Sequence, residues 1–350
     1  MLRAMSRRLA EVAAKVGVSE ATVSRVLNDK PGVSEATRQA VLTALDVLGY
    51  ERPAKLRGDR GRLVGLVVPE LQNPIFPAFA EVMGAALVQR GFIPLLCTQT
   101  AGGIAEADYV QLLLGHHVSG VVFAGGNHAQ AAASHDHYAR LAERRLPTIL
   151  INASVGRLPF ARVSCDDRVA AEQAIGHLLS LGHTDIGLLL GKPDHVPSLR
   201  KLEGARAYTE RRGMALPDSR VVHALYSLES GQAGAARLLE SGVTAIVCAS
   251  DLLALGAIRA VRRAGLEVPG DVSVTGFDDS AFMSLTDPPL TTVRQPIEAM
   301  GRAAVDLLGA LIEGADGSPQ EMLFEPELVV RGSTGPRRSD ARPPSSSTSP

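Results

Sequence analysis

Residues 9–28 read LAEVAAKVGVSEATVSRVLN, and this stretch decides the fold of the N-terminal part of the chain. Apolar residues recur every three or four positions up to Val16, which is typical of a helix with one buried face. Gly17 then permits a tight turn with left-handed backbone. Ser19 is a good N-cap for a second helix, because its hydroxyl oxygen can accept a backbone N–H that the helix leaves unpaired. We therefore predict two short helices joined by a tight turn.

The second predicted helix has one apolar face and one face of small and polar side chains. Val23, Val26 and Leu27 point inward, and the opposite face suits a helix whose N-terminal half enters a DNA major groove. An arginine can bind guanine N7 and O6 together, and an asparagine can bind a base edge or a phosphate. The predicted DNA-binding residues of this segment are Ser19, Glu20, Ala21, Thr22, Ser24, Arg25 and Asn28. The alternative is a plain helical packing module in which the polar face is merely solvated.

A third helix is expected from the N-cap candidate Ser34 to Tyr50, which completes a helix-turn-helix domain over residues 6–50. Charge supports this assignment. Residues 1–62 contain 12 lysines and arginines against 7 acidic residues, so they carry +5, whereas the whole chain carries -1. A basic head on an acidic body indicates that only the head faces a polyanion.

After residue 62 the pattern changes from short helices to alternating strands and helices. Residues 51–62, ERPAKLRGDRGR, are charged and contain proline and glycine, so we expect a linker there. The apolar runs expected to form strands are 63–68, 93–97, 118–124, 147–151, 185–191, 244–249 and 271–277. The expected helices are 76–90, 134–145, 167–181, 198–212, 229–240 and 251–264. This alternation predicts an α/β core of two doubly wound parallel-sheet subdomains over residues 63–335. The Pro- and Ser-rich tail 336–350 is expected to be disordered.

Several classes of protein are disfavoured by what the sequence lacks. Three widely spaced cysteines without a CxxC motif indicate reduced thiols, and we expect no metal and no cofactor. We find no signal peptide and no apolar run long enough to span a membrane, so we expect a cytoplasmic protein without a membrane partner. An enzyme on the same core is an alternative, but the nucleotide-binding and hydrolase motifs of such enzymes are absent.

The segment GVSEATVSRVLNDKPGVSEATRQAVLTALDVLGY (17–50) closely resembles the head of the lactose-repressor (LacI/GalR) family. In that family the two residues after the capping serine set much of the preference for the operator, the DNA site that the regulator binds. Those positions are Glu20 and Ala21 here. Glu20 would accept a hydrogen bond from cytosine N4, and Ala21 offers only apolar contact, for example to a thymine methyl. We therefore hypothesise that Glu20 discriminates a C·G pair.

The linker YERPAKLRG (50–58) departs from this family, whose members commonly form a hinge helix with a leucine wedged into the minor groove. Its proline is shifted by one position and it is about two residues shorter by comparison with the family. Leu56 is the candidate wedge, and Lys55 and Arg57 beside it could hold phosphates. Gly58 would weaken a helix, so a partly ordered linker is the alternative.

The core from about residue 63 to 333 also resembles this family and, more distantly, periplasmic sugar-binding proteins. The motifs that carry the resemblance include SLGHTDIGLLLG (180–191), PPLTTVRQP (288–296) and LVVRGST (328–334). The resemblance implies a ligand between the two subdomains, beyond the carboxyl ends of the strands. The effector-binding candidates are Phe76, Asp166, Lys201, Tyr226, Asp251, Asp278 and Gln295.

Some of these candidates have structural alternatives. Asp251 could cap the following helix, Asp278 could cap a turn, and Phe76 could belong to the core. Lys201 stands where the family has an arginine, so it offers a point charge instead of a bidentate fork. The resemblance implies a homodimeric repressor on a near-palindromic operator, controlled by a sugar-like small-molecule effector. The sequence leaves open whether the effector releases DNA or promotes binding, and a sugar-binding or sugar-processing protein on the same core is the alternative function.

Overall fold

The computed structural model describes residues 2–338, except 29, 49, 51–61, 100–102, 157 and 318. The head consists of three helices, α1 (Leu2–Val16), α2 (Glu20–Leu27) and α3 (Glu35–Val47). Gly17 adopts a φ of 74°, and its amide donates to the Ala13 carbonyl at 2.9 Å, which forms the predicted turn. Ser19 caps α2 by accepting the Thr22 amide at 3.1 Å, and Ser34 likewise accepts the Thr37 amide at 3.2 Å.

The helices of the head pack around a small apolar centre. Val12 of α1, Val23 and Val26 of α2, and Val41 and Leu45 of α3 are buried together. The period of the apolar residues predicted this packing, because side chains three or four positions apart lie on one helical face. The helix-turn-helix prediction is confirmed.

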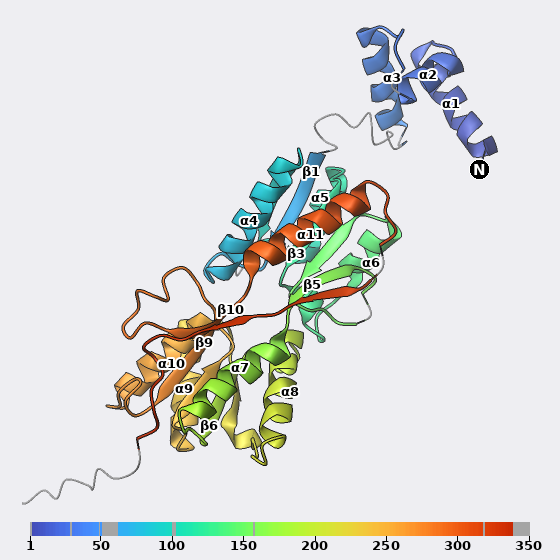
Figure 1. Cartoon of the computed structure of the whole chain (residues 1–350). Helices are drawn as coiled ribbons and strands as arrows, with labels where there is room; N and C mark the ends of the chain where they lie inside the picture. The colour runs from blue at the N-terminus through green and yellow to red at the C-terminus, as the bar shows by residue number, and fades with distance from the viewer. Residues whose placement is uncertain are drawn as a thin grey trace, which may run out of the picture.

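The first subdomain of the core is a six-stranded sheet in the order β11-β5-β4-β3-β1-β2, and all its pairings are parallel. Its strands are β1 (Leu63–Val68), β2 (Ile93–Thr98), β3 (Gly120–Ala124), β4 (Thr148–Ile151), β5 (Ala161–Cys165) and β11 (Glu321–Phe324). Its helices are α4 (Ile75–Gln89), α5 (Glu106–Gly115), α6 (Asp136–Glu143) and α11 (Ile297–Ile312). The contacts place α4 and α11 against one another and α5 near α6, so both faces are covered (Figure 1).

The second subdomain repeats this plan, with strand order β12-β10-β9-β8-β6-β7. Its strands are β6 (Ile186–Leu190), β7 (Val221–His223), β8 (Ala245–Cys248), β9 (Ser273–Asp278), β10 (Thr291–Arg294) and β12 (Glu327–Val329). The last of these pairs antiparallel with β10. Its helices are α7 (Asp167–Ser180), α8 (Val196–Glu210), α9 (Leu228–Glu240) and α10 (Asp251–Arg263), and α7 packs on α8 while α9 packs on α10. Two short 3-10 helices cover Asn127–Ala129 and Asp218–Arg220.

The described chain passes between the two subdomains at three places, which lie between β5 and α7, between β10 and α11, and between β11 and β12 (Figure 1). Each subdomain is therefore built from segments that are far apart in the sequence. The predicted class, two doubly wound parallel-sheet subdomains, is confirmed.

The structure differs from the sequence prediction in detail. Helices α5 and α11 and strands β7, β10, β11 and β12 are absent from the expected set. These strands have only three or four residues, and β11 and β12 are partly exposed. Their apolar runs are therefore too short to predict a strand. Residues 336–338 correct the expected extent of the disordered tail. The Arg337 amide donates to the Leu181 carbonyl at 2.8 Å, and the Arg338 guanidinium lies 3.3 Å from the Asp271 carboxylate.

Helices α9 and α10 approach each other so closely that glycine is required at the contact. A methyl group on Gly256 would lie 2.6 Å from the Gln232 nitrogen, and one on Gly231 would lie 2.7 Å from the Leu253 carbonyl oxygen. Both neighbours are backbone atoms and cannot rotate away. We expect Gly256→Ala to lower the free energy of unfolding by about 1–3 kcal/mol, because the two helices must separate. Chemical denaturation measures this change.

Gly115→Ala is the matched control, because Gly115 also lies in a helix but has open space around it. This control should change the free energy of unfolding by no more than about 0.5 kcal/mol. Equal effects of the two substitutions would contradict the proposed close contact.

Candidate functional site

The exposed face of α2 consists of small and polar residues. Glu20, Ala21, Arg25 and Asn28 are exposed, while Val23 and Val26 on the other face are fully buried. Thr22 and Ser24 are half-buried. Apart from Glu20 and Arg25 the face carries short side chains, so the backbone there can approach a base edge closely.

Four of the predicted DNA-binding residues hydrogen-bond one another within the head. Ser19 bonds the Thr22 hydroxyl at 2.9 Å as well as its amide, so both side chains serve the helix start. Asn28 donates its side-chain amide to the Ser24 carbonyl at 2.8 Å and closes the helix end. Glu20, Ala21 and Arg25 are exposed and are the side chains best placed to meet DNA. Leu56, the predicted minor-groove wedge, lies outside the described residues.

A cavity lies between the two subdomains of the core. Its lining comes from the carboxyl ends of strands in both sheets and from the loops and first helical turns that follow them, as expected for open parallel sheets. The first subdomain contributes Asn73, Ile75, Phe76, Gly125 and Asn152, and the second contributes Asp167, His195, Pro197, Lys201, Tyr226, Ala249, Ser250, Phe277, Asp278 and Gln295. Five of the seven predicted effector residues therefore meet here, namely Phe76, Lys201, Tyr226, Asp278 and Gln295.

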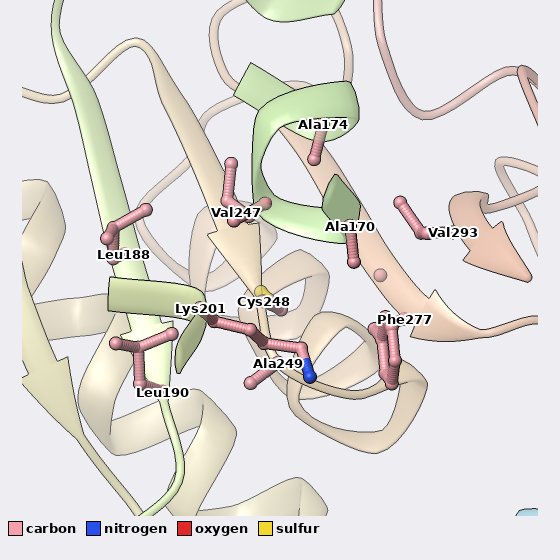
Figure 2. A pocket seen from close by; sticks show the side chains of 12 residues that line it. Ala170, Ala174, Leu188, Leu190, Lys201, Val247, Cys248, Ala249, Phe277 and Val293 are labelled. Carbon is pink, nitrogen blue, oxygen red and sulfur yellow. The ribbon is translucent and has the colours of Figure 1, made fainter. Parts of the chain in front are cut away.

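Lys201 supplies the permanently cationic side chain of this lining, and it is 7% exposed. Its aliphatic chain runs through an apolar pocket of the second subdomain from Leu190 toward Phe277, with Ala249 beside it (Figure 2). Its ammonium group bonds the Asp167 carboxylate and lies 3.7 Å from the centre of the Phe277 ring. Burial lowers the pKa of Lys201, but the charge and hydrogen bond of Asp167 together with the influence of Tyr226 outweigh burial, and the pKa is raised. Lys201 is therefore charged, and the Asp167 carboxylate balances its charge.

Asp278 presents its carboxylate to the cavity from the end of β9. Its oxygen accepts the Gln295 side-chain amide at 2.7 Å. Burial raises the pKa of Asp278 well above its usual range, and the charge of nearby Asp251 raises it further. The residue adopts a φ of 115°, which is rare for any residue except glycine.

Two predicted effector residues, Asp251 and Asp166, are not part of this lining. Asp251 is 2% exposed, and its oxygens accept the Ser280 amide at 2.7 Å and the Thr292 hydroxyl at 2.6 Å. Asp166 is the N-cap of α7 and accepts the Arg168 and Val169 amides at 3.1 and 3.2 Å. Its neighbour Asp167, in the first turn of α7, lines the cavity instead. Internal hydrogen bonds therefore occupy both carboxylates.

Two buried acceptors of the lining lack a partner within the described residues. These are Asn152 Oδ1 and Gln295 Oε1. An unpaired buried carbonyl is unfavourable, so a ligand with hydroxyl or amine donors would stabilise both. Of these two residues the sequence prediction included only Gln295. Asn152 follows β4 directly, and the rule that polar residues gather after parallel strands would have found it.

Tyr226 and His195 are neighbouring residues of the cavity lining. The Tyr226 hydroxyl lies 3.2 Å from the Ser198 hydroxyl and 3.4 Å from His195 Nδ1. A methyl group on Gly191 would overlap the Tyr226 ring, so this glycine lets the ring sit against the backbone. Burial lowers the pKa of His195 to about 3, so its ring is neutral at physiological pH. His195 escaped the sequence prediction because no pattern marks it.

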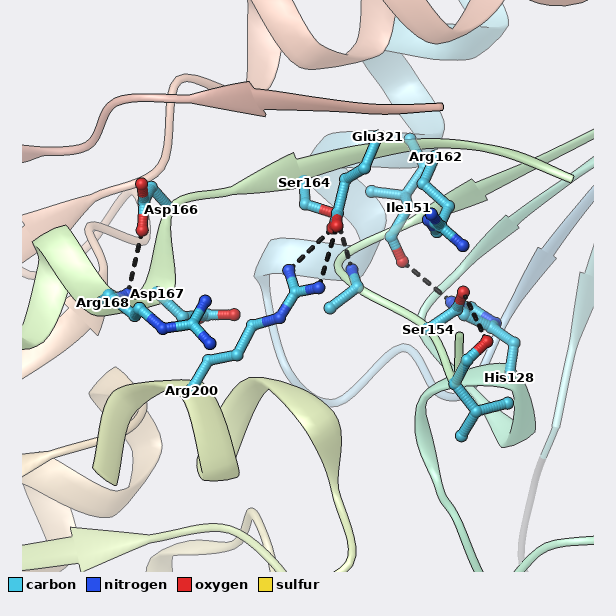
Figure 3. Close-up of polar contacts among 12 residues, drawn as sticks. His128, Ile151, Ser154, Arg162, Ser164, Asp166, Asp167, Arg168, Arg200 and Glu321 are labelled. Carbon is cyan, nitrogen blue, oxygen red and sulfur yellow. Dashed lines mark hydrogen bonds and ion pairs between the residues drawn. The ribbon is translucent and has the colours of Figure 1, made fainter. Parts of the chain in front are cut away.

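A forked ion pair joins the subdomains beside the cavity (Figure 3). Arg200 of α8 donates through both terminal nitrogens to the two oxygens of Glu321 on β11, at 2.7 and 2.8 Å. Ser164 of β5 also donates to Glu321 at 2.7 Å. The Arg200 and Glu321 side chains are 18% and 17% exposed. Adjacent residues of α8 therefore serve different purposes, because Arg200 ties the subdomains together and Lys201 faces the cavity.

A second contact between the subdomains lies at the loop after β3. The Ala131 amide donates to the Asp194 carbonyl at 3.0 Å, and Lys192 Nζ donates to Gln130 Oε1 at 3.2 Å. Gln130 and His195 also form an isolated antiparallel bridge. Main-chain bonds thus connect the subdomains next to the His195 side of the cavity.

Comparisons with known proteins match both parts of this architecture. A family model described as bacterial regulatory proteins, lacI family, matches residues 8–53, and a periplasmic binding protein-like domain matches residues 175–334. The HTH-type transcriptional regulator reg1 of Streptomyces lividans is 53% identical over 335 residues, which cover 94% of this chain and 97% of the relative. The chain belongs to the LacI family.

Solved structures of LacI-family regulators share the same fold. A transcriptional regulator CelR-cellobiose complex aligns with a TM-score of 0.72 at 34% identity, covering 93% of this chain and 99% of that chain. A lac repressor dimer bound to operator and the anti-inducer ONPF aligns with a TM-score of 0.69 at 29% identity, covering 93% and 98%. This LacI-family chain is therefore a DNA-binding transcriptional regulator and not an enzyme.

Two properties of the described residues concern membranes and metal ions. No helix there is long and apolar enough to cross a membrane. Histidine, cysteine and acidic side chains of the described part form no group of three or more arranged to hold a metal ion.

The Arg200–Glu321 fork should contribute to the stability of this LacI-family core. The Arg200 hydrogen bonds lower the pKa of Glu321 despite its partial burial, so its ionised form stabilises the folded state. We expect Glu321→Gln to lower the free energy of unfolding at pH 7 by about 1–3 kcal/mol. The contribution is present above the pKa of an unfolded glutamate and is lost as pH falls through the lower pKa of the folded state.

Urea denaturation of wild type and variant between pH 7 and pH 4 measures this effect. The difference between the two proteins should shrink toward the acid end of the range. A difference that stays constant with pH would contradict an electrostatic contribution from the fork.

Proposed function

We propose that this regulator is a repressor whose operator affinity is set by an uncharged, polyhydroxylated effector bound between its subdomains. We divide the chain into a DNA-binding head (6–50), a linker (51–62) and an effector-binding core (63–335). The observation that carries the proposal is the cavity itself, because it combines a neutralised cation with unpaired hydrogen-bond acceptors.

The charge of the cavity disfavours an anionic effector. Asp167 neutralises Lys201, and His195 is uncharged at physiological pH. Asp278 adds a carboxyl group, so the lining carries either no net charge or a negative one. A phosphate or carboxylate would lose its hydration here without gaining a free cation, which is strongly unfavourable.

The hydrogen-bonding groups favour a ligand with many donors. Asn152 Oδ1 and Gln295 Oε1 have no hydrogen-bond partner within the described residues, and the Asp278 carboxyl lines the same cavity. Phe76, Phe277 and Tyr226 supply apolar ring surface. Hydroxyl groups around a flat apolar ring face match this combination, and carbohydrates have that structure. The related CelR structure contains cellobiose, which supports the same class of ligand.

A binding panel tests the charge of the effector. Isothermal titration of the full-length protein with uncharged mono- and disaccharides, including cellobiose, is compared with the corresponding sugar phosphates. We expect at least one uncharged sugar to bind and to change operator affinity, and the matching phosphate to bind at least about 100-fold more weakly. A sugar phosphate that binds better than its parent sugar would refute the proposal.

Gln295→Met tests the role of the unpaired acceptor. This change removes both the acceptor and the bond to Asp278 while keeping the length of the side chain. We expect the dissociation constant for the bound sugar to rise about tenfold or more, because a ligand donor loses its partner. Gln111→Met is the control, because Gln111 is exposed on α5 and does not line the cavity.

For the head we propose that Glu20 and Ala21 select the operator sequence and that Arg25 grips it. A homodimer would place two heads in successive major grooves of a near-palindromic operator, about 34 Å apart. Leu56 and its basic neighbours in the linker would then lie at the minor groove between the half-sites.

Glu20→Gln tests the base-reading proposal. A carboxylate accepts hydrogen bonds only, whereas an amide both donates and accepts, so the preference for cytosine should relax by about 1–3 kcal/mol at one position of each half-site. Selection from a randomised operator library, followed by titration of the enriched sites, measures the change. An unchanged preference would show that Glu20 does not read a base.

A further inference from the structure

The turn that carries Asp278 has an unusual backbone. Asp278 has a φ of 115° and Asp279 has a φ of 58°, so two consecutive non-glycine residues lie in the left-handed region. Each such residue is unfavourable and persists only where its surroundings enforce it. The turn therefore needs an external cause, and two neighbouring contacts supply one.

The first contact supports the turn from inside the subdomain. Asp251, at the start of α10, accepts the Ser280 amide at 2.7 Å and the Thr292 hydroxyl at 2.6 Å. Its carboxylate approaches β9 so closely that a methyl group on Gly276 would lie 2.5 Å from Asp251 Oδ1. The carboxylate thus fixes the residue that ends the turn.

The second contact holds the turn from outside. Asp279 is 7% exposed and lies between two arginines, with Arg331 Nη2 at 2.7 Å and Arg294 Nε at 2.8 Å. Arg294 also bonds Glu327 at 3.0 Å. A carboxylate with charged partners on both sides is strongly oriented, so the backbone of Asp279 is fixed as well.

We propose that Asp251 and Asp279, neither of which lines the cavity, are positioning residues that hold the left-handed turn and thereby direct the Asp278 carboxyl into the cavity. The proposal rests on the proposed function, because it assumes that the cavity binds the effector. It assigns to Asp251 an indirect role in place of the direct contact expected from the sequence.

Preorganisation explains why two additional carboxyl groups are placed beside Asp278. A turn that relaxed to ordinary φ values in the free protein would have to be strained again whenever effector binds, and this would weaken binding. Asp251 and Asp279 keep the turn strained before binding. The position disfavours charge, because burial raises the pKa of Asp251 to about 6.

The test compares four full-length variants, Asp251→Ala, Asp251→Asn, Asp279→Ala and the control Asp218→Asn. The asparagine at 251 can still accept the Ser280 amide and donate to the Thr292 oxygen, so it should restore binding. Asp218 forms an exposed pair with Arg206 in the same subdomain, away from the cavity. The probe is the uncharged sugar of the panel that binds wild type most tightly, beginning with cellobiose.

We expect the dissociation constant for this sugar to rise at least about tenfold in Asp251→Ala and Asp279→Ala, and to stay within about threefold of wild type in Asp251→Asn and Asp218→Asn. Operator affinity without sugar should remain within about threefold of wild type in all four. A variant with a merely structural defect would lose operator affinity as well, so this comparison separates the two roles.

Hydrogen–deuterium exchange gives a readout that needs no sugar. Peptides that cover residues 276–283 should exchange faster in both alanine variants, while peptides from the first subdomain remain unchanged. Unchanged exchange in this turn, or wild-type sugar affinity in both alanine variants, would overturn the proposal. If no sugar binds wild type, the proposed function fails, and with it the assignment of these residues to effector recognition.

Discussion

The need to neutralise one buried cation organises the core of this protein. Lys201 runs between apolar side chains and ends at the cavity with only 7% of its surface exposed, so its charge requires a partner. Asp167 provides that partner from the first turn of α7, immediately after the chain enters the second subdomain. The ion pair thus fixes a point where α7, α8 and the crossover meet. It also leaves a cavity without free positive charge, which supports the proposal of an uncharged ligand.

Contacts between the subdomains are arranged around the same point. Arg200, next to Lys201, reaches Glu321 on the strand that precedes a crossover, and the loop at Asp194 bonds the loop at Ala131. A ligand that contacts Asn152 of the first subdomain together with Lys201 or Asp278 of the second would therefore act on both subdomains. Binding of effector and of operator are thermodynamically coupled in both directions if effector changes this arrangement.

The head is stabilised by a small apolar centre and by helix caps. Short side chains and caps hold α2 in place. This packing leaves a face with Glu20, Ala21 and Arg25 exposed. Substitutions at these exposed positions would therefore leave the packing of the three helices undisturbed.

Periodicity and turn chemistry within the sequence determined the head, the alternation of strands and helices, and the sheet edge at which the cavity lies. These features follow from local rules, because Gly17, Ser19 and the apolar runs act on neighbouring residues. Only the tertiary structure decided which polar residue of each loop faces the cavity. Asp167 lines it while Asp166 caps a helix, and Ser250 lines it while Asp251 turns inward to Ser280. Adjacent residues in a chain look alike in sequence, but their side chains point in different directions once the helix that follows them is packed.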